Sequence, residues 1–378
     1  MYASRKAASA HFAATLNQTK EGDMPGLYIG STSGFAGKNL VAMALGVMLK
    51  EQGYTVGYMK PVGTLPSQPE KTMGDEDAFF VQDVLGLTDD LELVTPVLVT
   101  HELRVQAFAE GCPDWMGKII KAYDILSKDK DIVIICGSGS FLHAGKYCDV
   151  AGLDVAQTLE AKVVLIDRFF KEFYYDYLIS AKELLGEAML GVIFNAVPDS
   201  RVSEVTDQLE PLLNRRGINM LGAIPEDHLL NAIRVYDLAQ RLNGKIISVP
   251  AKRDVMVENF LIGTMQVENF MNHFKKKKNS AVIVGGDRSD LQLVALEGKC
   301  SCLILTGNLY PNDIILTRSE VLEVPIIVVR DDTYTVAKTM ENILESSKLR
   351  DPVKVKHGAN LLNSIIDFST IKKGLGLD

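Results

Sequence analysis

The sequence predicts an α/β protein: a doubly wound parallel-sheet domain with a phosphate loop, followed by a second, smaller α/β domain. Short apolar runs of strand length recur along the chain and alternate with stretches of helical spacing. The runs are almost continuously apolar, which is typical of parallel strands that are buried on both faces and joined by crossover helices. A glycine-rich turn follows the first run, and the pattern begins again in a second block. The length of 378 residues suits about two or three domains.

The first domain is expected to extend from residue 24 to residue 242. Residues 1–23 are interpreted as an N-terminal extension, because they lack the long apolar segment of a secretory signal. The expected strands of this domain are the apolar runs 27–29, 54–59, 95–99, 132–135, 163–166, 190–194 and 221–224. Helical spacing predicts helices at 39–52, 115–126 and 174–185.

The second domain is expected at residues 243–350. Its predicted strands are 281–284, 302–305 and 325–329, and its predicted helices are 264–274, 290–297 and 333–344. Residues 351–378 contain apolar positions at helical spacing, which predicts one amphipathic helix followed by a polar tail. Such a helix can pack on a domain or on another subunit, so a homodimer or higher homo-oligomer is expected.

Composition argues against several classes of protein. The 40 Lys and Arg residues and 48 Asp and Glu residues give a net charge of −8, whereas nucleic-acid binding needs a concentrated basic face. No stretch reaches the ~20 apolar residues of a membrane span, so no membrane partner is expected. The cysteines show neither a disulfide framework nor zinc-site spacing, which predicts reduced thiols in a cytoplasmic protein. They are Cys112, Cys136, Cys148, Cys300 and Cys302.

The turn after the first strand is a candidate phosphate loop. Glycines let backbone N–H groups surround phosphate oxygens, a lysine adds charge, and the next helix contributes its N-terminal dipole. Relative to the pattern G-x-x-x-x-G-K-[ST], Thr32 replaces the first glycine and Asn39 replaces the final hydroxyl residue. The candidate nucleotide-binding residues are Gly30, Thr32, Gly34, Gly37, Lys38 and Asn39. The alternative is a glycine-rich turn with an exposed lysine.

Several segments of the first domain carry a family resemblance. The glycine loop and the segment 57–63 (GYMKPVG) resemble the dethiobiotin synthetase and cobyrinic acid a,c-diamide synthase group of P-loop proteins. The segments 191–195 (GVIFN) and 221–227 (LGAIPED) resemble later strands of that group. The resemblance implies a P-loop fold and ATP or another nucleotide as cofactor. For the enzymes of the group, it also implies activation of a carboxylate by phosphorylation.

The second block resembles the small DRTGG domain. Its segment 284–291 (VGGDRSDL) has Ser289 and Asp290 in place of the Thr and first Gly of that name. Both domains in this order, over residues 25–350, are similar to the N-terminal half of long bacterial phosphotransacetylases and to stand-alone proteins of the same layout. Only about 30 residues follow the second block, fewer than a domain requires, so acetyl transfer by this chain alone is not expected.

The resemblance implies roles for individual residues. Lys38 would contact the phosphates, and Lys60 would serve the substrate carboxylate and the transferred phosphate as a second catalytic cation. Asp77, or less well Asp75, would help to hold Mg²⁺, and Asn195 corresponds to the amide that contacts the adenine ring. The alternatives are a solvent-facing lysine at residue 60, carboxylates that cap the following helix, and an ordinary turn asparagine.

The sequence departs from the ligases after the strand 132–135. The relatives have a metal-binding glutamate there, and this chain has Cys136, whose alternative role is that of a small buried core residue. A thiol and the amide of Asn39 are poor replacements for the oxygen ligands of Mg²⁺, so Mg²⁺ binding and phosphoryl transfer are expected to be weakened. This favours a nucleotide-binding regulatory or sensor protein. The alternatives are an ATP-dependent ligase or amide synthetase, and a scaffold with an empty loop.

Turns of the second domain form another candidate site. They follow strands of one sheet, so they should gather at the same edge. The candidate ligand site consists of Asp287, Arg288 and Asn308, and it would suit an anionic small-molecule or nucleotide effector. The alternative is that the polar residues of these turns cap helices and that Arg288 pairs with a neighbouring aspartate.

Overall fold

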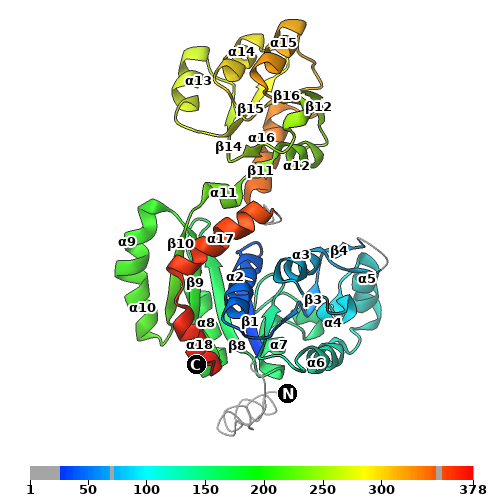
Figure 1. Cartoon of the computed structure of the whole chain (residues 1–378), viewed down its shortest axis with the longest axis vertical. Coiled ribbons are helices and arrows are strands. Elements are labelled where there is room, and N and C mark those ends of the chain that lie inside the picture. Colours follow the sequence, from blue (N-terminus) through cyan, green and yellow to red (C-terminus); the bar gives the residue numbers. More distant parts are fainter. Residues whose placement is uncertain (1–25, 69–71, 346–350, 378) are drawn as a thin grey trace. The chain divides into compact units, whose positions relative to one another are not determined.

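The computed structural model describes residues 26–68, 72–345 and 351–377. The expected N-terminal extension therefore lies outside the described residues. The chain divides into two compact units (Figure 1). Unit 1 comprises the residues up to Pro225 together with those from Gly358 onward, and unit 2 comprises Glu226–His357. The sequence predicted the first domain boundary at residue 242, whereas the compact units divide between Pro225 and Glu226.

A six-stranded parallel sheet forms the centre of unit 1 (Figure 1). Its strands are β1 (Gly26–Ser31), β2 (Val56–Met59), β7 (Ile132–Cys136), β8 (Lys162–Arg168), β9 (Met189–Val197) and β10 (Met220–Pro225). The order is β10-β9-β8-β1-β7-β2, so the chain winds outward from β1 in both directions. This confirms the doubly wound α/β prediction. Every residue of β1 and β7 is buried, which explains their continuous apolar sequences.

Helices follow the strands of this sheet. They are α2 (Lys38–Glu51), α3 (Glu76–Leu85), α4 (Leu91–Val94), α5 (His101–Glu110), α6 (Trp115–Leu126), α7 (Gly152–Thr158), α8 (Tyr175–Leu185), α9 (Val202–Glu204) and α10 (Glu210–Arg215), with a short 3₁₀ turn η1 (Lys146–Cys148) ahead of α7. The largely buried α2 packs on β1, β7 and α3. It begins directly after the glycine loop, so the loop lies at the carboxyl end of the central strand β1.

One predicted strand does not belong to the central sheet. Of the run 95–99, only β6 (Val97–Leu98) is a strand, and it pairs with β3 (Val62–Gly63) in a separate two-stranded sheet. A second small pair joins β4 (Pro66–Ser67) to β5 (Gly74–Asp75). Val97 is 2% exposed, so the apolar run reflects burial beneath these loops and not membership of the large sheet.

Unit 2 is a smaller α/β layer structure. Its strands are β11 (Ile233–Arg234), β12 (Lys245–Ser248), β13 (Met256–Val257), β14 (Asn259–Ile262), β15 (Ser280–Gly285), β16 (Cys302–Thr306) and β17 (Ile326–Val328), and its helices are α11 (His228–Asn231), α12 (Val235–Arg241), α13 (Val267–Phe274), α14 (Ser289–Glu297), α15 (Asp313–Leu322) and α16 (Thr333–Glu345). The main sheet has the order β12-β17-β16-β15-β14, with only β12 antiparallel. Two separate hydrophobic clusters pack on its faces: one involves α12 and α16, and the other involves α13, α14 and α15.

Two helices occupy the C-terminal segment, α17 (Pro352–Ile365) and α18 (Phe368–Leu375). The sequence predicted one helix and a polar tail here. Asp367 caps α18 by accepting a hydrogen bond from the Thr370 backbone N–H at 3.1 Å. Leu375 is buried, and Gly374 of α18 lies against Leu190 of β9, so the segment completes the packing of unit 1.

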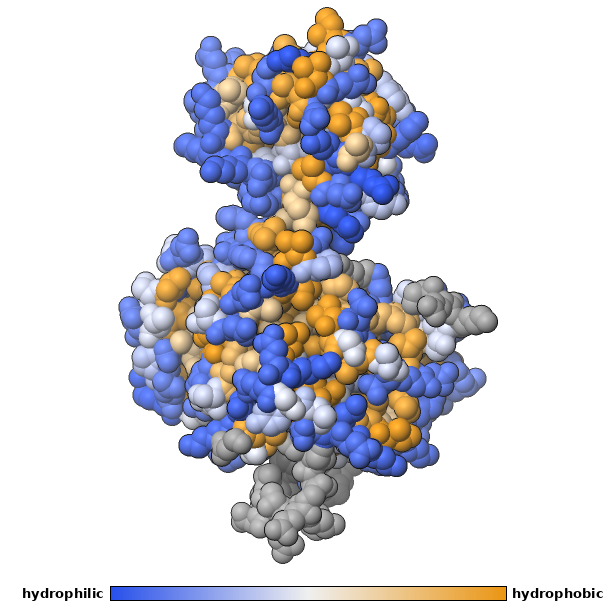
Figure 2. All heavy atoms as spheres, in the orientation of Figure 1, coloured by the Kyte–Doolittle hydropathy of each residue, from blue (hydrophilic) through white to orange (hydrophobic). Residues whose placement is uncertain are grey.

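The surface mixes hydrophilic and hydrophobic residues over both units on the face shown in Figure 2. Within residues 26–68, 72–345 and 351–377, no helix combines the length and apolar character needed to cross a membrane.

Candidate functional site

The glycine loop joins β1 to the start of α2. Gly37 has φ of 104°, and a Cβ atom there would lie 2.4 Å from Nδ2 of Asn195, so a glycine is required on both counts. No side chain among the described residues caps α2 with a hydrogen bond. The N–H groups of its first turn are therefore available to an anion at the positive end of the helix.

Lys38 begins α2 and its ammonium group turns back to the loop. Nζ donates to Ser31 Oγ at 2.7 Å and to the Gly139 carbonyl oxygen at 3.2 Å. The residue is 9% exposed. Its pKa is lowered to about 8, chiefly by burial and also by the charge of Lys60, while Cys136 and Asp77 act in the opposite direction. In the part of the chain that the structure describes, Lys38 forms no ion pair. A buried cation without a carboxylate partner is suited to meet an anionic ligand.

The loop is also held by a carboxylate that the sequence analysis did not single out. Thr32 Oγ1 donates to Asp167 Oδ1 at 2.5 Å, and the Tyr174 N–H donates to Asp167 Oδ2 at 2.8 Å. Burial raises the pKa of Asp167 to about 6, and these two hydrogen bonds oppose the shift. The only sequence signal was an acidic residue directly after the apolar run 163–166, near the end of β8.

Lys60 lies in a buried cluster with two carboxylates. Its Nζ is 2.7 Å from Asp75 Oδ1 and 3.1 Å from Asp77 Oδ2. Burial acts to lower the pKa of Lys60, but the charges of Asp77 and Asp75 outweigh it and raise the pKa. Asp75 also accepts four backbone N–H groups and caps α3. The structure therefore brings these three predicted residues together, with Asp75 already saturated by protein donors.

The two positions that depart from the ligase pattern are direct neighbours. Cys136 ends β7 and is fully buried, and its thiol donates to Asn39 Oδ1 at 3.3 Å. Burial raises the pKa of Cys136 even though Lys60 and Lys38 lower it. A neutral thiol thus occupies the space beside the start of α2 and uses the one side-chain oxygen that Asn39 could offer to a metal.

Asn195 lies on the other side of the loop. Its Nδ2 donates to the Ala36 carbonyl oxygen at 2.8 Å, and its Oδ1 accepts from the Ala196 N–H at 2.9 Å. In this arrangement the amide supports the loop. Gly30 is also packed tightly, because a Cβ atom there would lie 2.7 Å from the Phe141 ring, whereas Gly34 has open space around it.

A cavity of about 370 Å³ is lined in part by the segment that contacts Lys38. Gly139, whose carbonyl accepts from Lys38, is part of its lining, together with Tyr28, Arg104, Trp115 and Tyr147. No sequence motif predicts that these five residues meet, because they come from separate elements. The cavity gives the lysine a neighbouring space for a second small molecule.

Backbone hydrogen bonds join the turns of unit 2 at one sheet edge, from the Gly286 N–H to the Thr306 carbonyl and from the Gly307 N–H to the Asp331 carbonyl. The charged side chains of these turns nevertheless pair with close neighbours. Arg288 forms a double hydrogen bond with Asp290, from Nε to Oδ1 at 3.0 Å and from Nη2 to Oδ2 at 2.9 Å. Gln292 donates to the Gly285 and Gly286 carbonyls and ties the turn to α14. Asn308 adopts φ of 56°, a turn conformation that asparagine tolerates.

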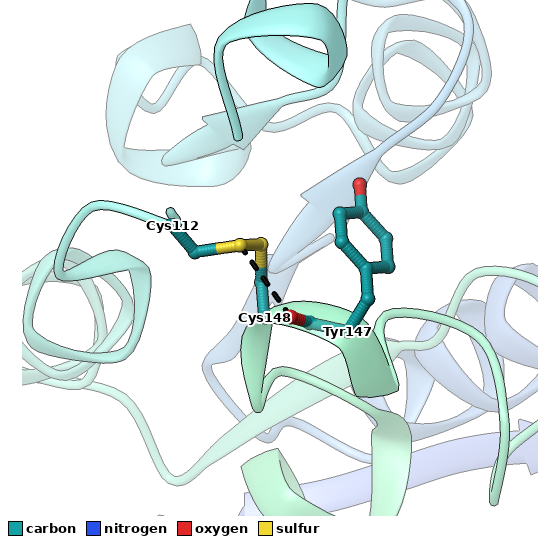
Figure 3. Close-up of a disulfide and its surroundings, with 3 residues drawn as sticks. All are labelled: Cys112, Tyr147 and Cys148. Atoms are coloured by element: carbon teal, nitrogen blue, oxygen red, sulfur yellow. Dashed lines mark hydrogen bonds between the residues drawn. A yellow bond between two sulfur atoms is a disulfide. The ribbon is translucent and has the colours of Figure 1, made fainter. Parts of the chain in front are cut away.

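No cluster of three or more His, Cys, Asp or Glu residues suited to a metal ion occurs among the described residues. The expectation of five reduced cysteines is wrong for one pair, since Cys112 and Cys148 form a disulfide (Figure 3). They are 36 residues apart in sequence, between α5 and α6 and at the end of η1, and spacing alone does not show that the fold brings them together. Cys136, Cys300 and Cys302 are free and buried, as expected.

Comparison with known families matches residues 25–234 to the AAA domain and residues 237–343 to the DRTGG domain. The phosphate acetyltransferase of Synechocystis sp. is 23% identical over 361 residues, which cover 90% of this chain and 50% of that protein. That of Pseudomonas aeruginosa is 24% identical over 369 residues, covering 90% of this chain and 51% of that protein. The chain thus spans about half the length of the phosphate acetyltransferases that it matches.

Unit 1 has shorter relatives as well. The ATP-dependent dethiobiotin synthetase of Methanocaldococcus jannaschii is 28% identical over 207 residues, which cover 52% of this chain and 92% of that protein. Among solved structures, the cobyrinic acid a,c-diamide synthase of Mycobacterium smegmatis with bound ATP analog and magnesium is 18% identical and covers 54% of this chain and 88% of its own, with a TM-score of 0.34. The match to dethiobiotin synthetase agrees with the resemblance stated from the sequence.

Proposed function

Because the chain belongs to the AAA domain family and carries a DRTGG domain after it, we propose that it is a nucleotide-binding regulatory protein. ATP, or a nucleotide with a similar phosphate chain, binds at the loop between β1 and α2. The second domain transmits or modifies the effect of nucleotide binding. The premise of this proposal is a P-loop domain joined to a DRTGG domain, which together are similar to the N-terminal half of phosphate acetyltransferases.

One observation supports nucleotide binding most strongly: the buried Lys38 has hydroxyl and carbonyl partners but no ion pair among the described residues. Removing a cation from water without a counter-charge costs free energy, and a phosphate group would restore the balance. The N–H groups at the start of α2 also support nucleotide binding, since Gly37 has no side chain that could accept their hydrogen bonds. The proposal assigns Gly30, Thr32, Gly34, Gly37 and Asn39 to shaping the loop.

The residues present do not fit a well-held Mg²⁺ ion. The side-chain oxygen of Asn39 accepts a hydrogen bond from the thiol of Cys136, and this neutral thiol is a poor ligand for a hard cation. Asp75 is saturated by backbone donors, and Asp77 pairs with Lys60. We therefore assign Lys60 and its carboxylates to a structural and electrostatic role, and we expect nucleotide binding to depend only weakly on Mg²⁺.

The second candidate function is an ATP-dependent ligase that activates a carboxylate. The cavity beside Lys38 favours it, because a co-substrate could lie there next to the terminal phosphate. The pairing of Asn39 with Cys136 argues against it, since both positions would normally serve the metal. The proposal further includes a cytoplasmic location and an effector that binds at unit 2. It also includes self-association of the chain, which sedimentation analysis would measure.

Calorimetric titration of the full chain with ATP and ADP, with and without Mg²⁺, tests the proposal. We expect ATP to bind in both conditions and phosphate release to remain at background. A Cys136→Glu/Asn39→Thr double variant restores the ligase-type oxygen ligands and should make binding more dependent on Mg²⁺. Robust Mg²⁺-dependent turnover by the unmodified protein would support the ligase, and undetectable binding would leave a scaffold with an empty loop.

A further inference from the structure

The cavity beside the phosphate loop has a wall made of two segments that are distant in sequence. Trp115 begins α6 on one side, and Tyr147 lies in η1 on the other. Both side chains line the cavity, and their rings meet edge to face with centroids 6.1 Å apart. Tyr147 is 49% exposed, and its ring also meets the ring of Phe108 edge to face, with centroids 5.5 Å apart.

The disulfide joins these two segments directly. Cys112 precedes Trp115 by three positions, and Cys148 is the neighbour of Tyr147 (Figure 3). The sulfur of Cys112 also lies 3.5 Å from the carbonyl oxygen of Tyr147. A covalent bond at this place restricts the distance between the Trp115 side of the wall and the Tyr147 side.

We propose that Cys112–Cys148 is a reversible redox clasp that holds this wall closed, so that the thiol–disulfide state of the protein controls access to the cavity beside Lys38. In the oxidised state the ring of Trp115 is shielded. In the reduced state the loop that carries Tyr147 is free to move away, and the cavity opens.

The chemistry needs a dithiol reductant. A thiolate of the reductant attacks one sulfur of the pair, and a mixed disulfide forms as the Cys112–Cys148 bond breaks. The second thiol of the reductant then displaces the protein sulfur. The net step transfers two electrons and two protons, leaves thiols on Cys112 and Cys148, and releases the reductant as its own disulfide. Cys112 is the more accessible residue of the pair, because it is partly exposed whereas Cys148 is only 8% exposed.

The clasp is also connected to the phosphate loop. The segment that ends at Cys148 begins after β7 and includes Gly139, whose carbonyl accepts the hydrogen bond from Lys38. Redox state therefore acts at one end of a segment whose other end contacts the lysine. This connection to nucleotide binding rests on the proposed function, whereas the closure of the cavity does not.

The single tryptophan makes the proposal testable, because Trp115 is the only one in the chain. Acrylamide quenching of its fluorescence is measured on the full chain after mild oxidation and after reduction with dithiothreitol, with circular dichroism to verify folding. Thiol titration of the oxidised, denatured protein should find the three free cysteines. We expect quenching to rise about twofold or more on reduction, as the wall loosens. Cys112→Ser should show the high value in both conditions.

Cys300→Ala is the matched control, since it removes a buried free thiol of unit 2 and should leave the redox response intact. Five free thiols in the oxidised protein, or equal quenching in both states, would overturn the inference. A parallel ATP titration separates this result from a failure of the proposed function: absent ATP binding in both states, with a persisting Trp115 response, rejects nucleotide binding and supports the clasp.

Discussion

Unit 1 and unit 2 each place a glycine turn and a cation at the carboxyl edge of a parallel sheet, yet the two cations differ. Lys38 is buried and has no ion pair within the described residues. Arg288 is partly exposed, and Asp290, two residues along the chain in the first turn of α14, neutralises it through two hydrogen bonds. A glycine turn and a charge therefore do not by themselves define a ligand site. A desolvated charge that the protein leaves uncompensated is the more informative feature.

The largest expected effect comes from the buried ion pair of unit 1. Asp75→Ala removes the nearer of the two carboxylate partners of Lys60, together with the acceptor of four backbone N–H groups. Breaking a buried pair of this kind lowers the free energy of unfolding by about 3–5 kcal/mol. Asp290→Ala in unit 2 breaks an exposed pair and should leave stability nearly unchanged. Urea denaturation followed by circular dichroism measures both, and equal effects would contradict the distinction between the units.

The disulfide gives the second largest effect. Cys112→Ser/Cys148→Ser opens a link across 36 residues, and loop-closure entropy predicts a loss of about 3–4 kcal/mol in the oxidised protein. Cys300 and Cys302 of unit 2 remain free, so Cys300→Ala provides the comparison and should cost less. Thermal unfolding with and without reductant checks the prediction. A double variant as stable as the oxidised wild type would show that the link does not constrain unit 1.

Replacing each of the two cations with a neutral side chain should affect ATP affinity in unit 1 but not in unit 2. Lys38→Met keeps the length of the side chain and removes the charge, so ATP should bind about 10- to 100-fold more weakly, in line with the ~1.5–3 kcal/mol of a charged hydrogen bond. Arg288→Met should leave the affinity unchanged, because that guanidinium is already paired. The reverse pattern in a calorimetric titration would move the nucleotide site to unit 2.

Lys38 also predicts a pH dependence. Its pKa in the folded protein is about 8, below the ordinary 10.5, because it is buried. Unliganded protein therefore loses this proton above pH 8, and ATP binding must restore it, so affinity should fall about tenfold per pH unit above 8. The same shift makes the contribution of Lys38 to folding stability rise between pH 8 and pH 10.5.

Titrations in two buffers with different ionisation enthalpies measure the protons taken up. Lys38→Met should abolish the uptake at pH 8. Lys354 of α17 has a pKa that burial likewise lowers to about 8, and Lys354→Met should retain the uptake. Uptake that survives in the Lys38 variant would assign the proton to another group.

Local patterns in the sequence predicted the features that depend on neighbouring residues. The strands of the central sheet, the glycine loop and the position of Lys38 follow from apolar runs and from one motif. Features that depend on distant contacts were missed. Thr32, after β1, contacts Asp167 of the neighbouring strand β8, and Cys112 bonds to Cys148, 36 residues away. The run 95–99 is buried without joining the central sheet. Neither periodicity nor spacing records such contacts.

Amide hydrogen exchange of the full chain, with and without ATP, tests the central claim most directly. The N–H groups of residues 31–39 should become protected when ATP binds, and those of residues 285–290 should exchange at the same rate in both conditions. Protection confined to residues 285–290, or no change at residues 31–39 at saturating ATP, would contradict the assignment of the nucleotide to the loop that begins α2.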